Sequence, residues 1–188
     1  MAQSAARTTN LTVEEFMILD TPEGKAELVR GELRLTPSPG PRHGIVGANV
    51  AFVLGQHVRS TGSGRVFTES CYELVQLPRT ARAPDVSFVR AERLPAGGIG
   101  DAQLRIAPDL AVEILSPSET ASRLDEKLDD YAASRVSIVW VIDPQRRTVR
   151  VIAADTPVRW LREGEMLDGG STIPGFACPV SDLFVGLD

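Results

Sequence analysis

The sequence predicts an α/β fold in which helices flank a mixed central sheet, and two observations support this prediction. Apolar residues recur at helical spacing over residues 42–59 and again over residues 121–134. Residues 110–115 and 137–142 are instead short and almost entirely apolar, as expected for strands that are buried on both faces. Helices have to cover such strands, so both kinds of element should pack in layers around one core.

The N-terminal part predicts a short helix followed by a strand or hairpin. Thr12, with Glu15 three residues later, forms the pattern of a capping box that opens a helix continuing through Leu19. Residues 26–35 (AELVRGELRL) predict the strand or hairpin, which ends at the proline-rich loop 37–41. Both elements precede the first long helix.

The central part predicts, in order, a helix, three strands, a second helix and a fourth strand. Their ranges are 42–59, 65–77, 83–89, 110–115, 121–134 and 137–142. The second helix carries Leu124, Leu128 and Tyr131 on one stripe. Residues 148–153 are the expected hairpin partner of the fourth strand, and short strands and loops follow to the end. The order αβββαβ predicts a mixed sheet flanked by helices.

Length and composition indicate one globular domain. The chain has 188 residues, of which 43% are hydrophobic and 24% are charged. We expect a flexible N-terminus over residues 1–10 and a single domain over residues 11–188. The formal net charge of −5 argues against a protein that coats nucleic acid, because such proteins are usually basic. It allows an enzyme that meets nucleic acid at one local site.

The sequence favours a cytoplasmic protein. The first ten residues lack the apolar segment of a secretory signal. The longest apolar runs fall far short of the about 20 residues that span a bilayer. A disulfide between Cys71 and Cys178 is conceivable, but two buried thiols in a reducing compartment are the favoured interpretation.

Several common catalytic motifs are absent from the sequence. Residues 97–100 (GGIG) lack the strand-then-helix setting of a dinucleotide site, and there is no Walker A sequence. His43 and His57 lie 14 residues apart and do not form a zinc-binding pair. Ser116 follows a leucine and precedes a proline, so it is not in a nucleophile elbow.

Charged residues in apolar surroundings are the strongest functional signal. Glu113 interrupts an apolar strand, and a buried carboxylate has to be paired, protonated or bound to a metal. Asp85 follows Pro84 at the start of another apolar strand. Lys127, one of only two lysines, lies 14 residues after Glu113 on the following helix. Because that helix returns along the sheet, two carboxylates and an ammonium can converge.

This combination suits the metal-assisted hydrolysis of a phosphodiester. Mg²⁺ prefers hard oxygen ligands and is usually held by one or two carboxylates together with waters and substrate phosphate. The metal lowers the pKa of a bound water, and a lysine can orient the nucleophile or stabilise negative charge. We expect Mg²⁺ as the cofactor, with Mn²⁺ able to replace it.

Each of the three residues also has a structural interpretation. Asp85 could cap the turn after Pro84, and Lys127 could pair with acidic neighbours on its own helix. Function is favoured for Glu113, because carboxylates inside apolar strands are seldom structural. If Lys127 instead reaches Glu113, three acidic neighbours should face solvent: Glu126, Asp129 and Asp130.

The same residues and their flanking motifs resemble a known family. The matching segments are ELVRGEL at 27–33, PSP at 37–39 followed by His43, APDV at 83–86, VEILSPS at 112–118, Lys127 with Tyr131, and VWVIDP at 139–144. In this order, from about Thr12 to Phe184, the chain resembles the Uma-two family of restriction-type endonucleases. More broadly it resembles the PD-(D/E)XK nuclease superfamily, in the variant whose lysine has moved from the strand to the next helix. Leu115 stands where the strand lysine would be.

The resemblance implies a restriction-endonuclease-like αβββαβ core, dependence on Mg²⁺, and Asp85, Glu113 and Lys127 as catalytic residues. It also places Glu27 and His43 beside the metal. Glu27 could equally pair with Arg30 or Lys25, and His43 could bond the backbone in the first turn of its helix.

We therefore interpret the chain as a Mg²⁺-dependent endonuclease that cleaves DNA with a metal-activated water. Asp85 and Glu113 are the expected metal ligands, and Lys127 is expected to position the nucleophile. Two alternatives stay open: a non-catalytic nucleic-acid-binding or regulatory module that retains the nuclease fold, and a hydrolase of small phosphorylated or acyl substrates. A homodimer is a further expectation, because cutting both strands of a duplex is simplest with two-fold symmetry.

Overall fold

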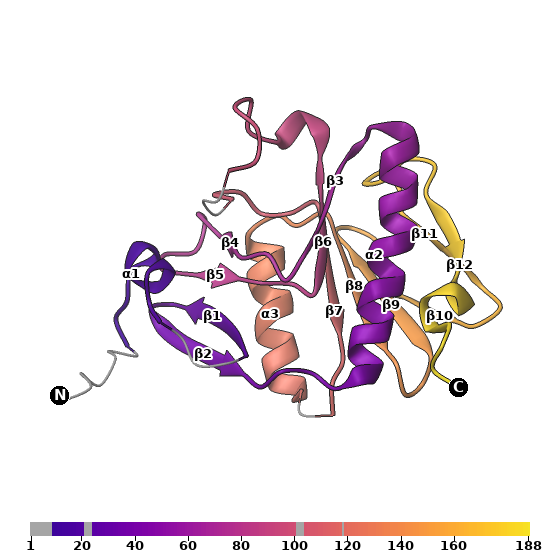
Figure 1. Ribbon diagram of the computed structural model, residues 1–188, viewed down its shortest axis with the longest axis horizontal. Helices are drawn as coiled ribbons and strands as arrows, with labels where there is room; N and C mark the ends of the chain where they lie inside the picture. The colour runs from indigo at the N-terminus through magenta and orange to yellow at the C-terminus, as the bar shows by residue number, and fades with distance from the viewer. Residues whose placement is uncertain (1–8, 21–23, 101–103, 118) are drawn as a thin grey trace.

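A six-stranded mixed sheet lies at the centre of the computed structural model, which describes residues 9–20, 24–100, 104–117 and 119–188 (Figure 1). Neighbouring strands are antiparallel except for β7 and β8, which are parallel. In spatial order the strands are β10 (Arg159–Arg162), β9 (Thr148–Ala153), β8 (Ile138–Asp143), β7 (Leu110–Ile114), β6 (Val86–Arg90) and β3 (Gly64–Thr68). Most of the flexible N-terminus expected over residues 1–10 lies outside the described residues.

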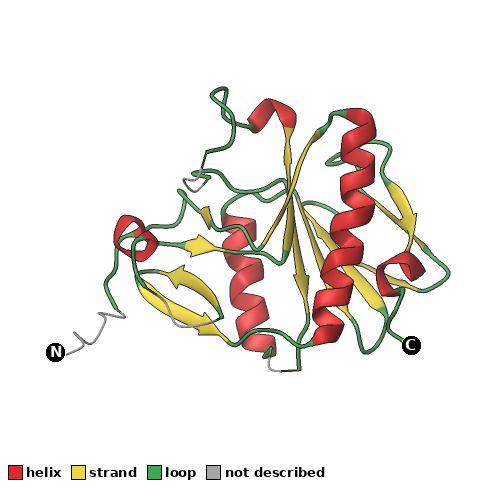
Figure 2. Ribbon diagram, in the orientation of Figure 1, coloured by secondary structure: helices red, strands yellow, loops and turns green. Residues whose placement is uncertain are grey.

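Two long helices cover the two faces of this sheet (Figure 2). On one face lies α2 (Pro41–Thr61), whose Val46, Val50 and Leu54 are fully buried against the strands. On the other lies α3 (Ala121–Ala133), the crossover between the parallel strands β7 and β8. The predicted order αβββαβ is thus confirmed, as is the mixed sheet flanked by helices.

The alternation of side chains along β7 decides which residues meet which helix. Leu110, Val112 and Ile114 pack in the core beneath α2, while Ala111 packs in the core beneath α3. Successive side chains of a strand point to opposite faces, so Glu113 also projects towards α3. The strand therefore presents its one charged side chain to the helix that carries Lys127.

A second, smaller sheet stands beside the central one, and the sequence did not predict it. Its strands, in spatial order, are β2 (Glu32–Thr36), β1 (Lys25–Val29), β5 (Ala81–Arg82) and β4 (Tyr72–Glu73). The predicted hairpin of residues 26–35 is confirmed as β1 and β2. Arg30 and Gly31 between them both have positive φ (50° and 84°), as a tight hairpin turn requires.

The strand expected over residues 65–77 is divided between the two sheets, as β3 and β4, which corrects the prediction. The strand expected over residues 83–89 is found as β6, but it starts later than predicted, after a break that separates it from β5 of the small sheet. Glu69, with φ 50°, turns the chain out of β3 and towards β4. At the second break, Pro84 has no N–H to offer a ladder, and the central strand begins only at Val86. The chain therefore crosses between the sheets at residues 83–85, and this crossover places Asp85 at their junction.

The remaining elements follow the sequence closely. The Thr12–Glu15 capping box opens α1 (Val13–Met17) as predicted, although the helix ends at Met17 instead of continuing to Leu19. β9 pairs with β8 as expected. The other short elements are η1 (Ala91–Arg93), β11 (Met166–Asp168), β12 (Ala177–Pro179) and η2 (Val180–Phe184).

The fold bears on two expectations from the sequence, one about the state of the two cysteines and one about membrane-spanning helices. No disulfide joins the two cysteines: Cys178 is buried, whereas Cys71 is only half-buried, so the expectation of two buried thiols was wrong for Cys71. Within the described ranges, neither α2 nor any other helix combines the length and apolar character that a membrane crossing requires.

Gly64, at the start of β3, lies too close to β6 to carry a side chain. A Cβ there would lie 2.2 Å from the carbonyl oxygen of Val89 and 2.5 Å from the ring of Phe88. We expect Gly64→Ala to lower the free energy of unfolding by about 1–3 kcal/mol, the usual cost of overpacking. Gly55 on α2 has no atom within 4 Å of the same position, so Gly55→Ala should raise it by about 0.5–1 kcal/mol. Urea denaturation of both variants is the measurement, and a Gly64→Ala protein as stable as the wild type would contradict the close approach of β3 and β6.

Candidate active site

Glu113 is the centre of a buried group of polar side chains. The residue is 3% exposed on β7, and both carboxylate oxygens accept hydrogen bonds from α3. Lys127 Nζ donates to Oε2 at 2.7 Å, and Tyr131 Oη donates to Oε1 at 2.6 Å. Lys127 and Tyr131 are four residues apart and share one face of the helix. The expectation that Lys127 reaches Glu113 is confirmed, and Tyr131 has a polar contact that its place on the apolar stripe did not predict.

Burial acts in opposite directions on the pKa values of the two charged partners. It raises the pKa of the Glu113 carboxyl, and the ammonium groups of Lys127 and Lys25 offset only part of this effect. Burial lowers the pKa of Lys127, but the carboxylates of Glu113 and Glu27 outweigh it, and the net shift is upward. Burial and the same carboxylates raise the pKa of Tyr131 well above its ordinary value. The hydroxyl of Tyr131 therefore stays protonated and remains a donor.

Asp85 reaches from the crossover between the sheets to three different elements. Its Oδ2 accepts hydrogen bonds from the backbone N–H of Ile114 at 2.7 Å and from His43 Nε2 at 3.1 Å. Its Oδ1 accepts from Lys25 Nζ at 2.6 Å. Burial alone would raise the pKa of Asp85, but the hydrogen bond from His43 and the charge of Lys25 outweigh it and lower the pKa. Asp85 is thus more than a cap of its own turn, because it bonds to β7, α2 and β1.

His43 contacts Asp85 from the first turn of α2. Pro41 occupies the first helical position, where a missing N–H costs nothing, so the helix begins just before the site. The imidazole of His43 is mostly buried and bonds the Asp85 carboxylate, not the backbone. His43 and Lys25 thus hold the two different carboxylate oxygens of Asp85.

Glu27 belongs to a second pair of buried charges next to the first. Its Oε2 accepts from Arg82 at 3.2 Å and its Oε1 from the N–H of Ala83 at 3.0 Å, so its partner is neither of the two expected, Arg30 and Lys25. Burial would raise the pKa of Glu27, but the charges of Lys127, Arg82 and Lys25 together lower it.

Asp130 corrects the prediction about the acidic neighbours of Lys127. Asp129 is exposed as expected and Glu126 is half-exposed, but Asp130 is only 1% exposed. Arg82 donates to its Oδ2 from two nitrogens, at 2.9 and 2.6 Å, and Arg30 donates to its Oδ1 at 2.8 Å. These donors make burial of the carboxylate favourable, which no pattern on the helix alone indicates.

Three residues of the site were missed from the sequence: Lys25, Arg82 and Asp130. One signal was available for Lys25. It is one of two lysines and lies two residues before Glu27, so both side chains leave the same face of β1. Arg82 and Asp130 are 48 residues apart, and the sequence offered no sign of their pairing.

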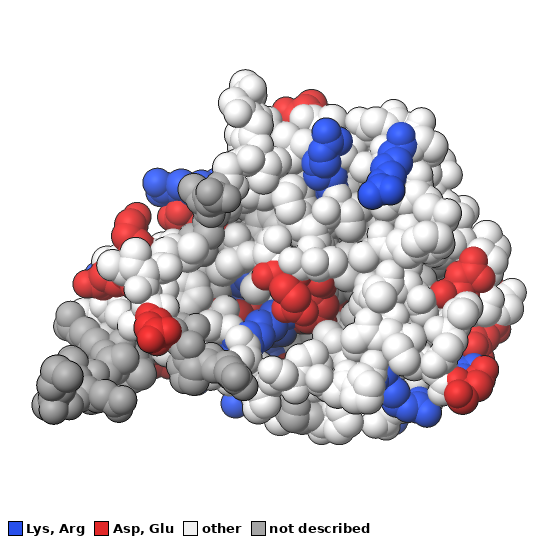
Figure 3. Space-filling view, in the orientation of Figure 1, with Lys and Arg blue, Asp and Glu red and all other residues white. Residues whose placement is uncertain are grey.

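Several cavities open at this group of charges, among them one of about 210 Å³ beside His43 and Asp85, and Figure 3 shows acidic and basic side chains side by side in a hollow at the centre of this face. A small cavity of about 30 Å³ is lined by Lys25, Glu69, Asp85, Glu113 and Lys127, among others. A polar groove of about 530 Å³ runs between β2 and α3. Its lining shares Thr36, Glu119 and Lys127 with the small cavity. Lys127 therefore borders both spaces.

Two carboxylates of the site can supply ligands to a metal ion. Among the described residues, no three His, Cys, Asp or Glu side chains are placed to hold one. Mg²⁺ nevertheless keeps several waters and is commonly held by one or two carboxylates, so Asp85 and Glu113 are a sufficient protein contribution. Their hard oxygen donors fit Mg²⁺, although the ammonium of Lys25 already contacts one of them.

Comparisons with known proteins agree with this architecture. The model of the Uma2 family, described as "Putative restriction endonuclease", matches residues 13–181. A crystal structure described as a "putative nuclease belonging to DUF820", from Anabaena variabilis, is 24% identical in sequence with a TM-score of 0.80, covering 93% of this chain and 97% of that one. At this identity the likeness establishes the fold. No curated protein sequence matches the chain.

The hydrogen bond from Tyr131 to Glu113 can be tested against a matched pair elsewhere in the core. We expect Tyr131→Phe to lower the free energy of unfolding by about 1–3 kcal/mol, because a buried carboxylate oxygen loses its donor. The control is Tyr72→Phe, which removes a 2.7 Å hydrogen bond between the equally buried hydroxyls of Tyr72 and Ser87. Tyr72→Phe should lower the free energy of unfolding by less than Tyr131→Phe, since neither of the two hydroxyls is charged. Urea denaturation compares the two, and an equal or smaller loss for Tyr131→Phe would count against a charged acceptor.

Proposed function

The chain belongs to the Uma2 family, and on that basis we propose that it is an endonuclease that hydrolyses DNA phosphodiester bonds with the help of Mg²⁺. One observation carries the proposal. Asp85 and Glu113 line a single cavity, and the Lys127 ammonium lies 2.7 Å from Glu113 at its border. Two hard carboxylates beside a buried ammonium suit the hydrolysis of a phosphodiester.

Asp85 and Glu113 would hold the metal ion, and Mn²⁺ could replace Mg²⁺ there. When bound, the ion supplies a water of lowered pKa and neutralises phosphate charge. The remaining residues keep the two carboxylates in position. His43 and the Ile114 N–H orient Asp85, while Tyr131 and Lys127 orient Glu113. Such support keeps first ligands within the narrow geometry that catalysis needs.

Lys127 is the group we assign to the substrate. Its raised pKa keeps the ammonium charged, and it borders both the small cavity and the polar groove. There it can stabilise negative charge that develops on a phosphate oxygen and orient the attacking water. The stem of the side chain is held by burial along α3, so the charged end has a defined position.

The polar groove is where we propose that the nucleic-acid strand lies. Arg34 and Arg123 line it beside Lys127, and both are exposed; Arg34 also pairs with the exposed Glu32 at 2.8 Å. Glu119 and Glu126 line the groove as well, so its surface is cationic only around the arginines and Lys127. A local cationic surface next to the site agrees with a chain whose net charge is −5.

A second candidate function is a nucleic-acid-binding or regulatory module that retains the nuclease fold without catalysis. One observation favours it: each oxygen of Asp85 and of Glu113 already accepts a hydrogen bond, and three of these bonds come from Lys25, His43 and Lys127. Such a network is complete without an ion. Cleavage assays distinguish the two candidates.

Plasmid nicking tests the proposed reaction. We expect supercoiled DNA to be nicked with Mg²⁺ or Mn²⁺ and not with a chelator. Glu113→Ala should lower the rate by about 10²-fold or more, because it removes a proposed metal ligand. The control is Asp129→Ala, which removes an exposed carboxylate of α3 and should leave the rate unchanged. Equal rates for wild type and Glu113→Ala would sink the proposal, and inactivity of every form would favour the binding module.

Lys127 is tested by two substitutions of different kinds. Lys127→Ala should lower the nicking rate by about 10²-fold or more, the scale lost with one charge-stabilising donor. Lys127→Arg should not restore full activity, because a planar guanidinium does not replace a compact ammonium. Rates are measured at saturating metal, with circular dichroism to verify folding. Undiminished nicking by Lys127→Ala would make the lysine a purely structural partner of Glu113.

A further inference from the structure

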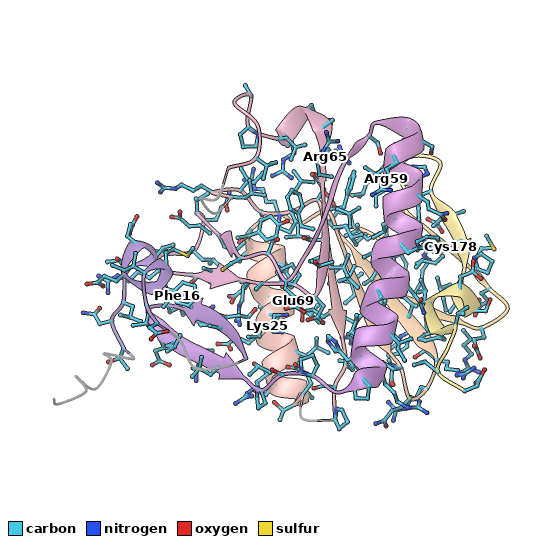
Figure 4. All side chains as sticks on the ribbon, viewed as in Figure 1. Phe16, Lys25, Arg59, Arg65, Glu69 and Cys178 are labelled. Atoms are coloured by element: carbon cyan, nitrogen blue, oxygen red, sulfur yellow. The ribbon has the colours of Figure 1, made fainter. Side chains whose placement is uncertain are left out.

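Lys25 is a charged residue at the site to which the proposed reaction gives no role. It lies on β1, its side chain is 13% exposed, and its Nζ is 2.6 Å from Asp85 Oδ1. The same nitrogen is 3.7 Å from a carboxylate oxygen of Glu69, and Figure 4 shows the two labelled residues next to each other. Burial lowers the pKa of Lys25, but the carboxylates of Glu113 and Asp85 outweigh it and raise the pKa. Lys25 is therefore a cation placed against a proposed metal ligand.

The charges of the site are already balanced with Lys25 in this position. Ion pairs among the described residues match each buried carboxylate of the site to a cation. The carboxylates are Glu27, Asp85, Glu113 and Asp130, and their cations are Arg82, Lys25, Lys127 and Arg30. A divalent ion on Asp85 would add two positive charges beside the ammonium of Lys25. In a buried site this repulsion is only weakly screened.

The size of the small cavity also argues that a metal ion and the Lys25 ammonium compete for Asp85. The cavity between Lys25, Asp85 and Glu113 has a volume of about 30 Å³, which is room for only about two or three water molecules. Mg²⁺ gives up its waters reluctantly and usually keeps several of them. A hydrated ion that binds both Asp85 and Glu113 in this cavity therefore needs room that the ammonium and stem of Lys25 now occupy.

We propose that Lys25 is a built-in competitor of the metal ion, and that the ion binds Asp85 only when the Lys25 ammonium leaves it. Glu69 is half-exposed and 3.7 Å away, so it offers the ammonium a second partner nearer to solvent. Lys25 thereby sets the metal affinity of the site without touching the reacting atoms. This inference rests on the proposed function, because it takes Asp85 as a metal ligand.

Metal titration of a charge-removing variant tests the inference without any measurement of activity. Lys25→Met keeps the length and apolar stem of the side chain and removes the charge. Calorimetric titration of the chelator-treated full chain with Mg²⁺ and Mn²⁺ should show binding at least about 10-fold tighter than in the wild type, since a positive charge next to the ion is gone. The control is Arg59→Met, which removes an exposed positive charge from the other end of α2 and should leave the affinity unchanged.

Thermal melting gives a second readout. Without metal, Lys25→Met should melt below the wild type, because Asp85 is left buried without its cation. Saturating Mg²⁺ should then raise its melting temperature more than that of the wild type, since tighter binding to the folded state stabilises it more. Lys25→Gln, which keeps a donor for Asp85 but no charge, should shift the affinity in the same direction. If Lys25→Met does not fold, Lys25→Gln still tests whether removal of the charge tightens metal binding.

The outcomes separate the inference from the proposed function. If the wild type binds metal and neither Lys25 variant binds it more tightly, the inference is wrong and the metal-dependent function stands. If neither the wild type nor the variants bind metal, both are wrong. Tighter binding that disappears when Asp85→Asn is added to Lys25→Met supports the inference, because it places the gain at Asp85.

Discussion

The burial of Glu113 is the constraint on which the surrounding structure depends. A carboxylate in the middle of a buried strand is unfavourable unless charged or hydrogen-bonding donors replace its water. β7 cannot turn this side chain outward, because its alternate positions, including Val112, fill the core beneath α2. The donors therefore have to come from α3, and Lys127 and Tyr131 supply both. These two contacts therefore link the geometry of the site to the position of α3, which also packs on the sheet through Leu124.

Buried charges also join the two sheets. Arg82 of the small sheet bonds both Glu27 on β1 and Asp130 on α3, while Asp85 bonds Lys25 on β1 and the backbone of β7. The small sheet has an apolar cluster of its own around Leu28, and Tyr72 on β4 packs in the core beneath α3. Polar contacts and the packing of Tyr72 together fix the placement of the small sheet. A site at this junction is preorganised, because moving any one charge leaves its partner unpaired.

Much of the fold followed from local patterns. Helical spacing located α2 and α3, and short apolar runs located β7 and β8, because the burial of each element imposes its own period on the sequence. The same reasoning failed over residues 65–77, where one stretch of chain serves both sheets as β3 and β4. Apolar character is the same on both sides of such a break. The exact point of crossing depends on the pairing of β4 with β5, which follows it in the sequence.

The residues of the candidate site also divide into those that one sequence segment indicates and those that only the folded structure brings together. Glu113 was singled out from the sequence because a charge inside an apolar strand is a local anomaly that a single segment displays, whereas Asp85 and Lys127 depended on the family resemblance as well. Lys25 and Asp130 were not found, because their neighbourhoods are polar and their partners lie 60 and 48 residues away. Periodicity is a property of one backbone segment and can be recognised along the chain. The pairing of buried charges is a property of segments brought together by folding, so it emerges only when the sheets and α3 are packed.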